Sequence, residues 1–202
     1  MTPVFRHLGV KKYEEIHQQM QQFTDQRNGD TRDEVWFVEH TPVFTLGRNK
    51  DKENVLIESE IPFVKSDRGG DVTYHGPGQL IVYCMIDLKR LNLGVKALVT
   101  GLEEIFIQYL YGYEIEGHRI ESAPGVYVKG EKIASLGLRV RNGCSFHGMS
   151  INVDMDLTPF TYIHPCGLEG MKVTQLTSMN IHKTCSDVAT ELSEAMIQKF
   201  YS

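Results

Sequence analysis

The residues best suited to chemistry lie in one glycine-rich segment, Arg68-Gly-Gly-Asp-Val-Thr-Tyr-His-Gly-Pro-Gly-Gln79. Paired glycines let the backbone come close to a ligand and direct its N–H groups at a carbonyl or an anion. Arg68 adds a positive charge, and Thr73 and His75 can donate or accept hydrogen bonds. The segment fits neither the phosphate-binding P-loop nor the GxGxxG pattern. Composition alone leaves two alternatives equally open, a ligand-binding loop or a tight turn whose glycines only satisfy backbone geometry.

Lys132 is the second candidate for chemistry. By strand alternation it shares a face with the apolar positions of the strand expected to follow, Ala134, Leu136, Leu138 and Val140. Burial disfavours the charged form of an amine, which is how a lysine side chain becomes usable as a general base. The alternative is that Lys132 lies at the end of a hairpin and extends its ammonium group to water.

The third candidate is Cys166, which stands between a proline and a glycine in the apparent loop Tyr162-Ile-His-Pro-Cys-Gly167. Small, rigid neighbours expose a thiol, whereas structural cysteines usually lie in apolar strands, as Cys84 does. A thiolate nucleophile needs a partner that accepts its proton, and Lys132 or a histidine could serve. We therefore expect Cys166, ahead of the other three cysteines, to be the nucleophile.

A fourth feature is the segment Phe146-His-Gly-Met-Ser-Ile-Asn152. Its glycine and serine leave room beside a ligand, although a strand with a bulge explains them equally well. A zinc site would have to combine Cys144, His147, His164 and Cys166. The spacing within both pairs is unfavourable for zinc, so we expect neither a metal nor another cofactor.

The elements that must position these residues follow from periodicity. Apolar residues at three- and four-residue steps predict helices over 13–23, 95–111 and 188–200, the first ended by Asn28-Gly29 and the last preceded by the N-cap candidate Ser186. Strands are predicted over 35–39, 43–46, 79–88, 126–128, 133–140 and 146–153, with a hairpin loop at 129–132. Short turns join most strands, so we expect an α+β fold with a largely antiparallel sheet, in one domain over residues 1–202.

Composition, net charge, cysteine pattern and the length of apolar runs exclude several classes of protein. The 202 residues are 41% hydrophobic and 23% charged, which excludes a disordered chain, and the net charge of −5 argues against nucleic-acid binding. The four cysteines form no CxxC pair and are expected to be reduced thiols. The longest apolar run, 80–86, is too short to span a bilayer, and the N-terminus has no apolar stretch of signal-peptide length. We expect a cytoplasmic protein with no membrane partner.

Taken together, the motifs resemble the lipoyl(octanoyl) transferase family. The glycine-rich segment, with Tyr83 four residues beyond it, is similar to the signature of that family. Glu39-His-Thr-Pro-Val-Phe-Thr-Leu-Gly-Arg48, Lys132-Ile-Ala-Ser-Leu-Gly-Leu-Arg139 and Pro165-Cys-Gly167 match further family motifs in the same order. The resemblance spans about Glu39 to Gly167, and four motifs in order are far more specific than one.

The resemblance implies the fold of biotin and lipoate protein ligases, a mixed, mostly antiparallel sheet flanked by helices. It also implies a reaction that moves octanoyl from octanoyl-acyl carrier protein to a lysine ε-amine. The acceptors would be lipoyl domains of 2-oxoacid dehydrogenases and the glycine cleavage H protein. Carried over by position, Cys166 would form an acyl thioester, and Lys132 would lower the pKa of that thiol and act as general base and acid. The residues implied to line the acyl site are Arg68, Gly69, Gly70, Asp71, Val72, Thr73, Tyr74, His75, Ser135, Leu136, Gly137, Gly148, Met149 and Ser150.

Two other functions are compatible with the sequence. An ATP-dependent lipoate or biotin protein ligase would share the fold, but it would need a triphosphate site and would not need Cys166. A non-catalytic module that binds lipoyl domains or acyl chains would form no covalent adduct, and Lys132 would be an ordinary hairpin residue. Strict ATP dependence would identify the ligase, and the absence of an adduct would identify the binding module.

Overall fold

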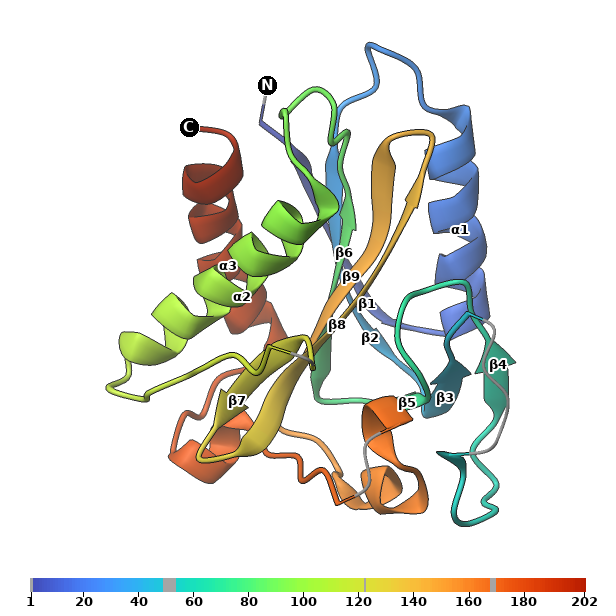
Figure 1. Ribbon diagram of the computed structural model, residues 1–202, viewed down its shortest axis with the longest axis vertical. Helices are drawn as coiled ribbons and strands as arrows, with labels where there is room; N and C mark the ends of the chain where they lie inside the picture. The colour runs from blue at the N-terminus through green and yellow to red at the C-terminus, as the bar shows by residue number, and fades with distance from the viewer. Residues whose placement is uncertain (1, 49–53, 122, 168–169) are drawn as a thin grey trace.

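The computed structural model describes residues 2–48, 54–121, 123–167 and 170–202, and in these a six-stranded sheet forms the centre of the protein (Figure 1). Its strands are β1 (Val4–Lys11), β2 (Glu34–His40), β6 (Gln79–Met85), β7 (Gly125–Val128), β8 (Glu131–Arg141) and β9 (Cys144–Asn152). Their order is β1-β2-β6-β9-β8-β7. The β1–β2 pair is parallel and each other neighbouring pair is antiparallel, which confirms the predicted mixed, mostly antiparallel sheet.

A small sheet lies beside the main one and carries part of the glycine-rich segment. It consists of β4 (Phe63–Lys65), β3 (Val43–Leu46) and β5 (Thr73–His75), in the order β4-β3-β5. Its apolar side chains form a core with residues after β9, namely Phe44, Leu46, Val72, Tyr74, Met155, Phe160 and Ile163. Since β5 ends at His75 and β6 begins at Gln79, a three-residue turn carries the glycine-rich segment from the small sheet into the main one.

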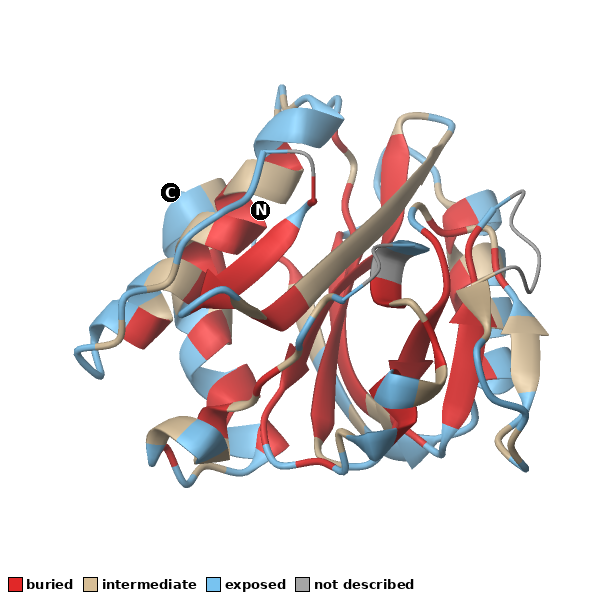
Figure 2. Cartoon of the chain, turned by 60° about the horizontal axis from the view of Figure 1, so that its bottom comes forward, coloured by how far each residue is buried: buried red, intermediate tan, exposed pale blue. Residues whose placement is uncertain are grey.

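Helices cover both faces of the main sheet (Figure 1). Helix α1 (Tyr13–Gln26) packs Ile16 and Met20 on one face, and α2 (Val95–Tyr111) and α3 (Cys185–Phe200) pack on the other. Every residue of β6 and β9 is buried between these layers (Figure 2). All three predicted helices are confirmed, and α2 has the predicted bounds. In the part of the chain that the structure describes, no helix has the length and apolar character needed to cross a membrane.

Some element boundaries differ from the predicted ones. The last helix is capped by Thr184, whose hydroxyl accepts from the N–H of Asp187 (3.1 Å) while the Asp187 carboxylate accepts from the N–H of Thr184 (2.9 Å). Ser186 is therefore not the cap, because the reciprocal bonds fix the helix start two residues earlier. Strand β6 ends at Met85 rather than at residue 88. The hairpin turn comprises only Lys129 and Gly130, so β8 already begins at Glu131.

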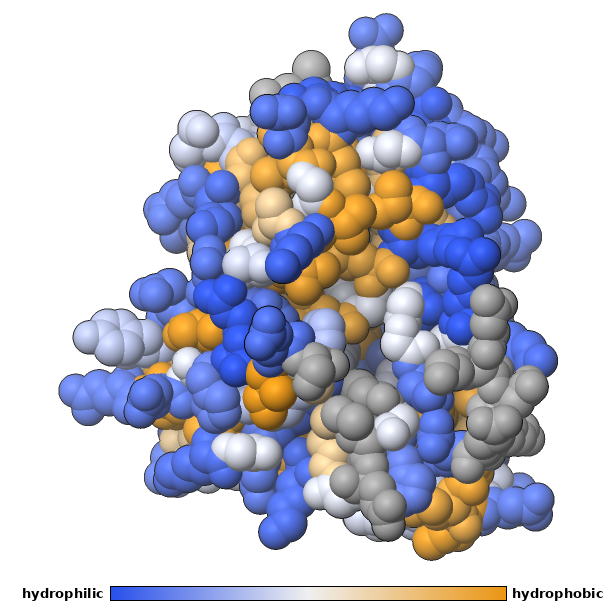
Figure 3. All heavy atoms as spheres, in the orientation of Figure 1, coloured by the Kyte–Doolittle hydropathy of each residue, from blue (hydrophilic) through white to orange (hydrophobic). Residues whose placement is uncertain are grey.

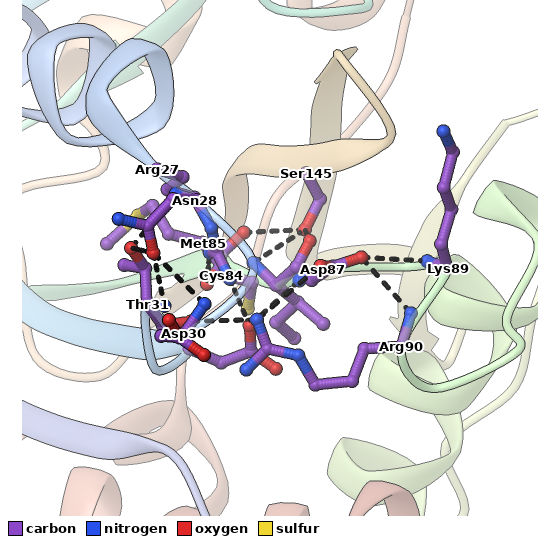
Figure 4. A network of polar contacts seen from close by, with 12 residues as sticks. Arg27, Asn28, Asp30, Thr31, Cys84, Met85, Asp87, Lys89, Arg90 and Ser145 are labelled. Carbon is purple, nitrogen blue, oxygen red and sulfur yellow. Dashed lines mark hydrogen bonds and ion pairs between the residues drawn. The ribbon is translucent and has the colours of Figure 1, made fainter.

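A buried ion pair fastens the segment between α1 and β2. Arg27 and Asp33 pair with side chains 4% and 1% exposed, and Arg27 also donates to the carbonyl of Met85 (2.6 Å). Asp33 accepts further bonds from the N–H of Asp87 (2.9 Å) and the hydroxyl of Tyr201 (2.9 Å). Figure 4 shows the surrounding turn contacts, in which Asp87 accepts from two N–H groups of the segment after it. The end of α1, the end of β6 and the C-terminus are thus held together.

The face seen in Figure 1 is not uniformly polar. Figure 3 shows hydrophobic side chains gathered on its upper part, where β8 and the start of α2 lie. The half-buried apolar residues of β8 on the main core are Leu136, Leu138 and Val140. Helices α2 and α3 therefore leave part of the sheet's apolar surface accessible.

Candidate functional site

A narrow pocket opens between the main sheet and the glycine-rich segment. Its cavity volume is about 50 Å³, well below the range of most small-molecule sites. It is lined by Tyr13, Arg68, Gly70, Asp71, Thr73, His75, Ile81, Tyr83, Ser135, Leu136, Gly137, His147, Gly148, Met149 and Ser150. Most of the site residues expected from the sequence are therefore brought together. Val72 and Tyr74 lie instead in the core of the small sheet, and Gly69 donates its N–H to the carbonyl of Leu138 (3.2 Å).

Small residues in two cross-strand rows form the floor of the pocket. Ser135 of β8 is opposite Ser150 of β9, and Gly137 is opposite Gly148. Paired residues point to the same face of a sheet, so these rows present little side chain to the pocket. A Cβ at Gly137 would lie 2.9 Å from the carbonyl oxygen of Gly69. The glycine-rich segment can therefore lie directly on the sheet.

Arg68 shapes this segment through bonds to backbone carbonyls. Its side chain is buried, and Nη2 donates to the carbonyls of Thr45 and Asp71, both at 2.6 Å. Nη1 donates to the carbonyl of Gly69 (2.9 Å). Because charge-assisted bonds to several carbonyls hold one conformation, the guanidinium fixes the wall of the pocket as well as lining it.

Two buried histidines, His75 and His147, line the pocket, and a third, His40, lies beside His75 with ring centroids 6.0 Å apart. His40 Nε2 is bonded to the Tyr83 hydroxyl (2.8 Å), and His75 Nδ1 to Gln79 Oε1 (2.7 Å). Burial lowers their pKa values, to about 4 for His40, about 3 for His75 and about 4 for His147. Neutral aromatic rings therefore wall the pocket at pH 7, and burial also raises the pKa of the adjacent Tyr13 to about 12.

Sequence reasoning did not identify Tyr13 as a pocket residue. Its position in an apolar helical stripe correctly predicts that it is buried, but nothing in that pattern indicates a ligand. Its ring stacks parallel to that of His75, with centroids 6.0 Å apart, and its hydroxyl is bonded to Ser66 (2.6 Å). The packing of α1 over β5 brings Tyr13 to the pocket, and this tertiary contact has no local signal.

Lys132 is buried, with 3% of its surface exposed, but it does not lie on the predicted face. In the β7–β8 ladder Tyr127 pairs with Lys132. The next pair joins Val126 to Ala134, so Ile133 is inserted as a bulge. Tyr127 and Val126 point to opposite faces, and their partners must do the same. Ile133 and Ala134 both lie in the core under α2 and α3, whereas Lys132 points to the pocket face. The expectation that it shares the face of Ala134 is wrong, because the bulge reverses the alternation.

The surroundings of Lys132 connect it to the segment after Cys166. Its Nζ lies 5.5 Å from the centroid of the Tyr127 ring. A Cβ at Gly125 would lie 2.5 Å from its Cε. Its N–H donates to the carbonyl of Lys172 (2.9 Å), and its carbonyl accepts from the N–H of Thr174 (3.0 Å). Lys132 is thus enclosed rather than directed to water, which contradicts the alternative of an exposed hairpin lysine.

Cys166 lies in the short helix η3 (Pro165–Gly167), between η2 (Thr158–Tyr162) and η4 (Leu176–Met179), and its side chain lies outside the described residues. The backbone of η3 is anchored by the N–H of His164, which donates to the carbonyl of Asn54 (2.8 Å). A Cβ at Gly167 would lie 2.9 Å from Asp71 Oδ2. The helix that carries Cys166 therefore packs against the glycine-rich segment at the edge of the pocket.

The structure does not support the zinc site that would combine Cys144, His147, His164 and Cys166. His147 Nε2 lies 2.8 Å from Asp67 Oδ1. Among the described residues, the group of candidate ligands that contains His147 includes neither Cys144 nor His164. His147 therefore lies with Asp67, next to the glycine-rich segment, rather than with the sequence-neighbouring cysteine.

Comparisons with a family model, with sequence relatives and with solved structures agree with one another. Residues 12–197 match the family model described as Lipoyl protein ligase A/B catalytic domain. An octanoyltransferase of Dechloromonas aromatica is 50% identical over 199 residues, covering 98% of this chain and 97% of the relative. A bipartite lipoate protein ligase of Thermoplasma acidophilum, whose structural analysis includes its E2 lipoyl domain, superposes with a TM-score of 0.76 at 14% identity, covering 98% of this chain and 84% of that one. Biotin protein ligase of Aquifex aeolicus gives 0.59 at 11% identity, covering 99% and 70%.

Proposed function

The chain belongs to the family of the lipoyl protein ligase A/B catalytic domain, and from this membership we infer that it is an acyltransferase that transfers octanoyl groups in protein lipoylation. The name of the half-identical relative, octanoyltransferase, supports this reaction. We propose that residues 1–202 form one catalytic domain. The donor would be octanoyl-acyl carrier protein, and the acceptors would be lipoyl domains of 2-oxoacid dehydrogenases and the glycine cleavage H protein.

The proposed reaction has two steps. The Cys166 thiolate attacks the thioester carbonyl of the donor, a new carbon–sulfur bond forms, and the carrier thiol leaves with a proton. The lysine amine of the acceptor then attacks the Cys166 thioester, a carbon–nitrogen bond forms, and the cysteine sulfur leaves. Exchange of one thioester for another is nearly isoenergetic, so loading needs no ATP. Lys132 would accept the thiol proton in the first step and the ammonium proton in the second.

The enclosure of Lys132 on the pocket face is the observation that carries this proposal. A lysine is almost never fully buried unless it is paired, and here a bulge turns it toward the side where the octanoyl group would bind. Its backbone pairs with residues 172–174, shortly after the segment that carries Cys166. The Ser135–Ser150 and Gly137–Gly148 pairs present only small side chains to the pocket, which suits an unbranched acyl chain.

Lipoate and biotin protein ligases share this fold, so the test of the proposed reaction is its independence of ATP. The deciding experiment incubates the full chain with octanoyl-acyl carrier protein without ATP and measures its intact mass. We expect one octanoyl adduct that is absent from Cys166→Ala, present in the control Cys185→Ala, and discharged by a lipoyl domain. In Lys132→Met, loading should be roughly 10²- to 10⁴-fold slower, the usual contribution of a general base. An adduct that survives Cys166→Ala, or transfer that requires ATP, would refute the thioester route.

A further inference from the structure

Two histidines and an aspartate from three different elements converge beside the pocket. His17 lies on α1, Asp67 directly precedes the glycine-rich segment, and His147 lies on β9. One ligand atom from each lies within 4.8 Å of the other two. Both Nε2 atoms approach Asp67 Oδ1, at 2.9 Å from His17 and 2.8 Å from His147. We propose that these three residues bind a divalent transition-metal ion of the Zn²⁺ class.

The backbone of His147 aims its ring into this cluster. By strand alternation His147 would point to the α2–α3 face, opposite to its neighbour Phe146. Its φ of +59° is in the left-handed region, which is uncommon for a residue with a Cβ. The result is that the His147 ring stacks on the Phe146 ring, with centroids 5.0 Å apart, on the α1 face. The fold therefore holds an unfavourable backbone conformation that brings this imidazole to Asp67 and His17.

Gln21 joins the polar contacts around His17. His17 Nε2 lies 2.9 Å from Asp67 Oδ1 and 3.2 Å from Gln21 Nε2, and the Gln21 amide also donates to Asp67 Oδ2 (3.5 Å). Without an ion, His17 and Gln21 can both donate to the Asp67 carboxylate. A metal ion would instead be bound by the lone pairs of both imidazoles and by the carboxylate. A half-turn of the Gln21 amide would then present Oε1 as a fourth ligand, because Gln21 lies one helical turn after His17 on the same face of α1.

The donor set indicates the class of ion. Two imidazole nitrogens and one carboxylate suit Zn²⁺, Co²⁺, Ni²⁺ or Fe²⁺, whereas Mg²⁺ and Ca²⁺ prefer oxygen ligands. Arg141 opposes binding, since its Nη2 lies 4.0 Å from Asp67 Oδ2. Asp25 offsets part of that charge through bonds of 2.7 and 2.8 Å to Arg141 Nη1. We therefore expect micromolar rather than nanomolar affinity.

The site would act on the pocket rather than on the reacting atoms. Asp67 adjoins Arg68 and His147 adjoins Gly148, and both of these neighbours line the pocket. An ion bound here would join α1, the glycine-rich segment and β9 at one point. It would hold the pocket wall in place and raise the melting temperature, with a shift that grows with the logarithm of the ion concentration above Kd.

The test titrates the chelator-treated full chain with ZnCl₂ by calorimetry and with CoCl₂ by absorption spectroscopy. We expect one equivalent to bind, with at least tenfold weaker binding in His17→Ala and no change in His182→Ala, which removes an exposed histidine outside the cluster. Alanine is a good helix former and His17 is half-buried, so α1 should persist, as circular dichroism would verify. The cobalt spectrum of the unaltered chain is a second readout that needs no variant, and it should lack thiolate-to-cobalt charge-transfer bands. No binding, unchanged binding in His17→Ala, or a thiolate spectrum would overturn the proposal.

Discussion

The position of Lys132 can be tested without altering Lys132 itself, through the change Gly125→Ala. Gly125 starts β7 with a φ of +148°, and an added Cβ would lie 2.5 Å from Lys132 Cε and 3.4 Å from Nζ. Ordinary van der Waals contact begins at 3.4 Å, so the lysine stem has to move by roughly 1 Å. A shift of that size in a catalytic group costs on the order of 10²-fold in rate. We expect Gly125→Ala to transfer octanoyl about a hundredfold more slowly.

The same change has a cost in stability that must be separated from the effect on the rate. The new Cβ would also lie 2.5 Å from the carbonyl oxygen of Ala134. Together with the unfavourable φ, we expect about 1–3 kcal/mol of destabilisation, which a domain of ordinary stability survives. Urea denaturation would give the folded fraction of each variant.

Gly130→Ala is the matched control for Gly125→Ala. Gly130 lies in the turn between β7 and β8 with a φ of +82°, and no heavy atom lies within 4 Å of its added Cβ. It imposes similar backbone strain without touching Lys132. The assay follows loading and discharge of the octanoyl adduct by intact mass in single turnovers. A folded Gly125→Ala variant with the unaltered rate would refute the reasoning, and so would an equal loss in Gly130→Ala.

Three further predictions concern stability. Burial lowers the folded-state pKa of the buried histidines below their ordinary value of 6.5. Their contribution to the free energy of unfolding should therefore be fully present above pH 6.5 and fall by about 1.4 kcal/mol per pH unit and per histidine toward pH 4. Equal urea midpoints on either side of pH 6.5 would contradict this. Asp33→Asn should destabilise the fold by about 3–5 kcal/mol, because Arg27 would stay buried without its counter-charge, and an unchanged urea midpoint would contradict that reading. Thr184→Ala should cost about 1 kcal/mol and Ser186→Ala only a few tenths, since Thr184 caps α3; the reverse order in thermal unfolding would place the cap at Ser186.

The sequence predicts the long elements well because their pattern repeats over several turns. The apolar stripe of α2 predicts its bounds, and β6 is apolar from Leu80 to Met85. Strand β1 was not predicted, because it is a largely exposed edge strand without an apolar alternation. Strands β4 and β5 were not predicted either, since three residues are too few for a period to appear.

The parts of the site that the sequence did not predict depend on how the chain is arranged in three dimensions. The glycine-rich segment and the β8 and β9 motifs were expected to meet, and most of their residues do line one pocket. The sequence left open whether Lys132 is buried or extends to water. The structure buries it, but on the face opposite to the predicted one, because one inserted residue separates it from Ala134. Tyr13 joins the pocket through the packing of α1, and His147 joins it through an unusual φ. Neither a tertiary contact nor one unusual backbone angle produces a periodic pattern in the sequence, so neither was predicted.

The bulge at Ile133 also bears on how this sequence can diverge. A substitution at that position changes one apolar side chain in the core. Deletion of the same residue would leave Ala134 opposite Val126 and Lys132 opposite Tyr127, so Lys132 would stay on the pocket face. The face of Lys132 is therefore set by its pairing with Tyr127 and not by the number of residues that separate it from Ala134. The register of β8 on β7 is the character that natural selection would have to preserve here.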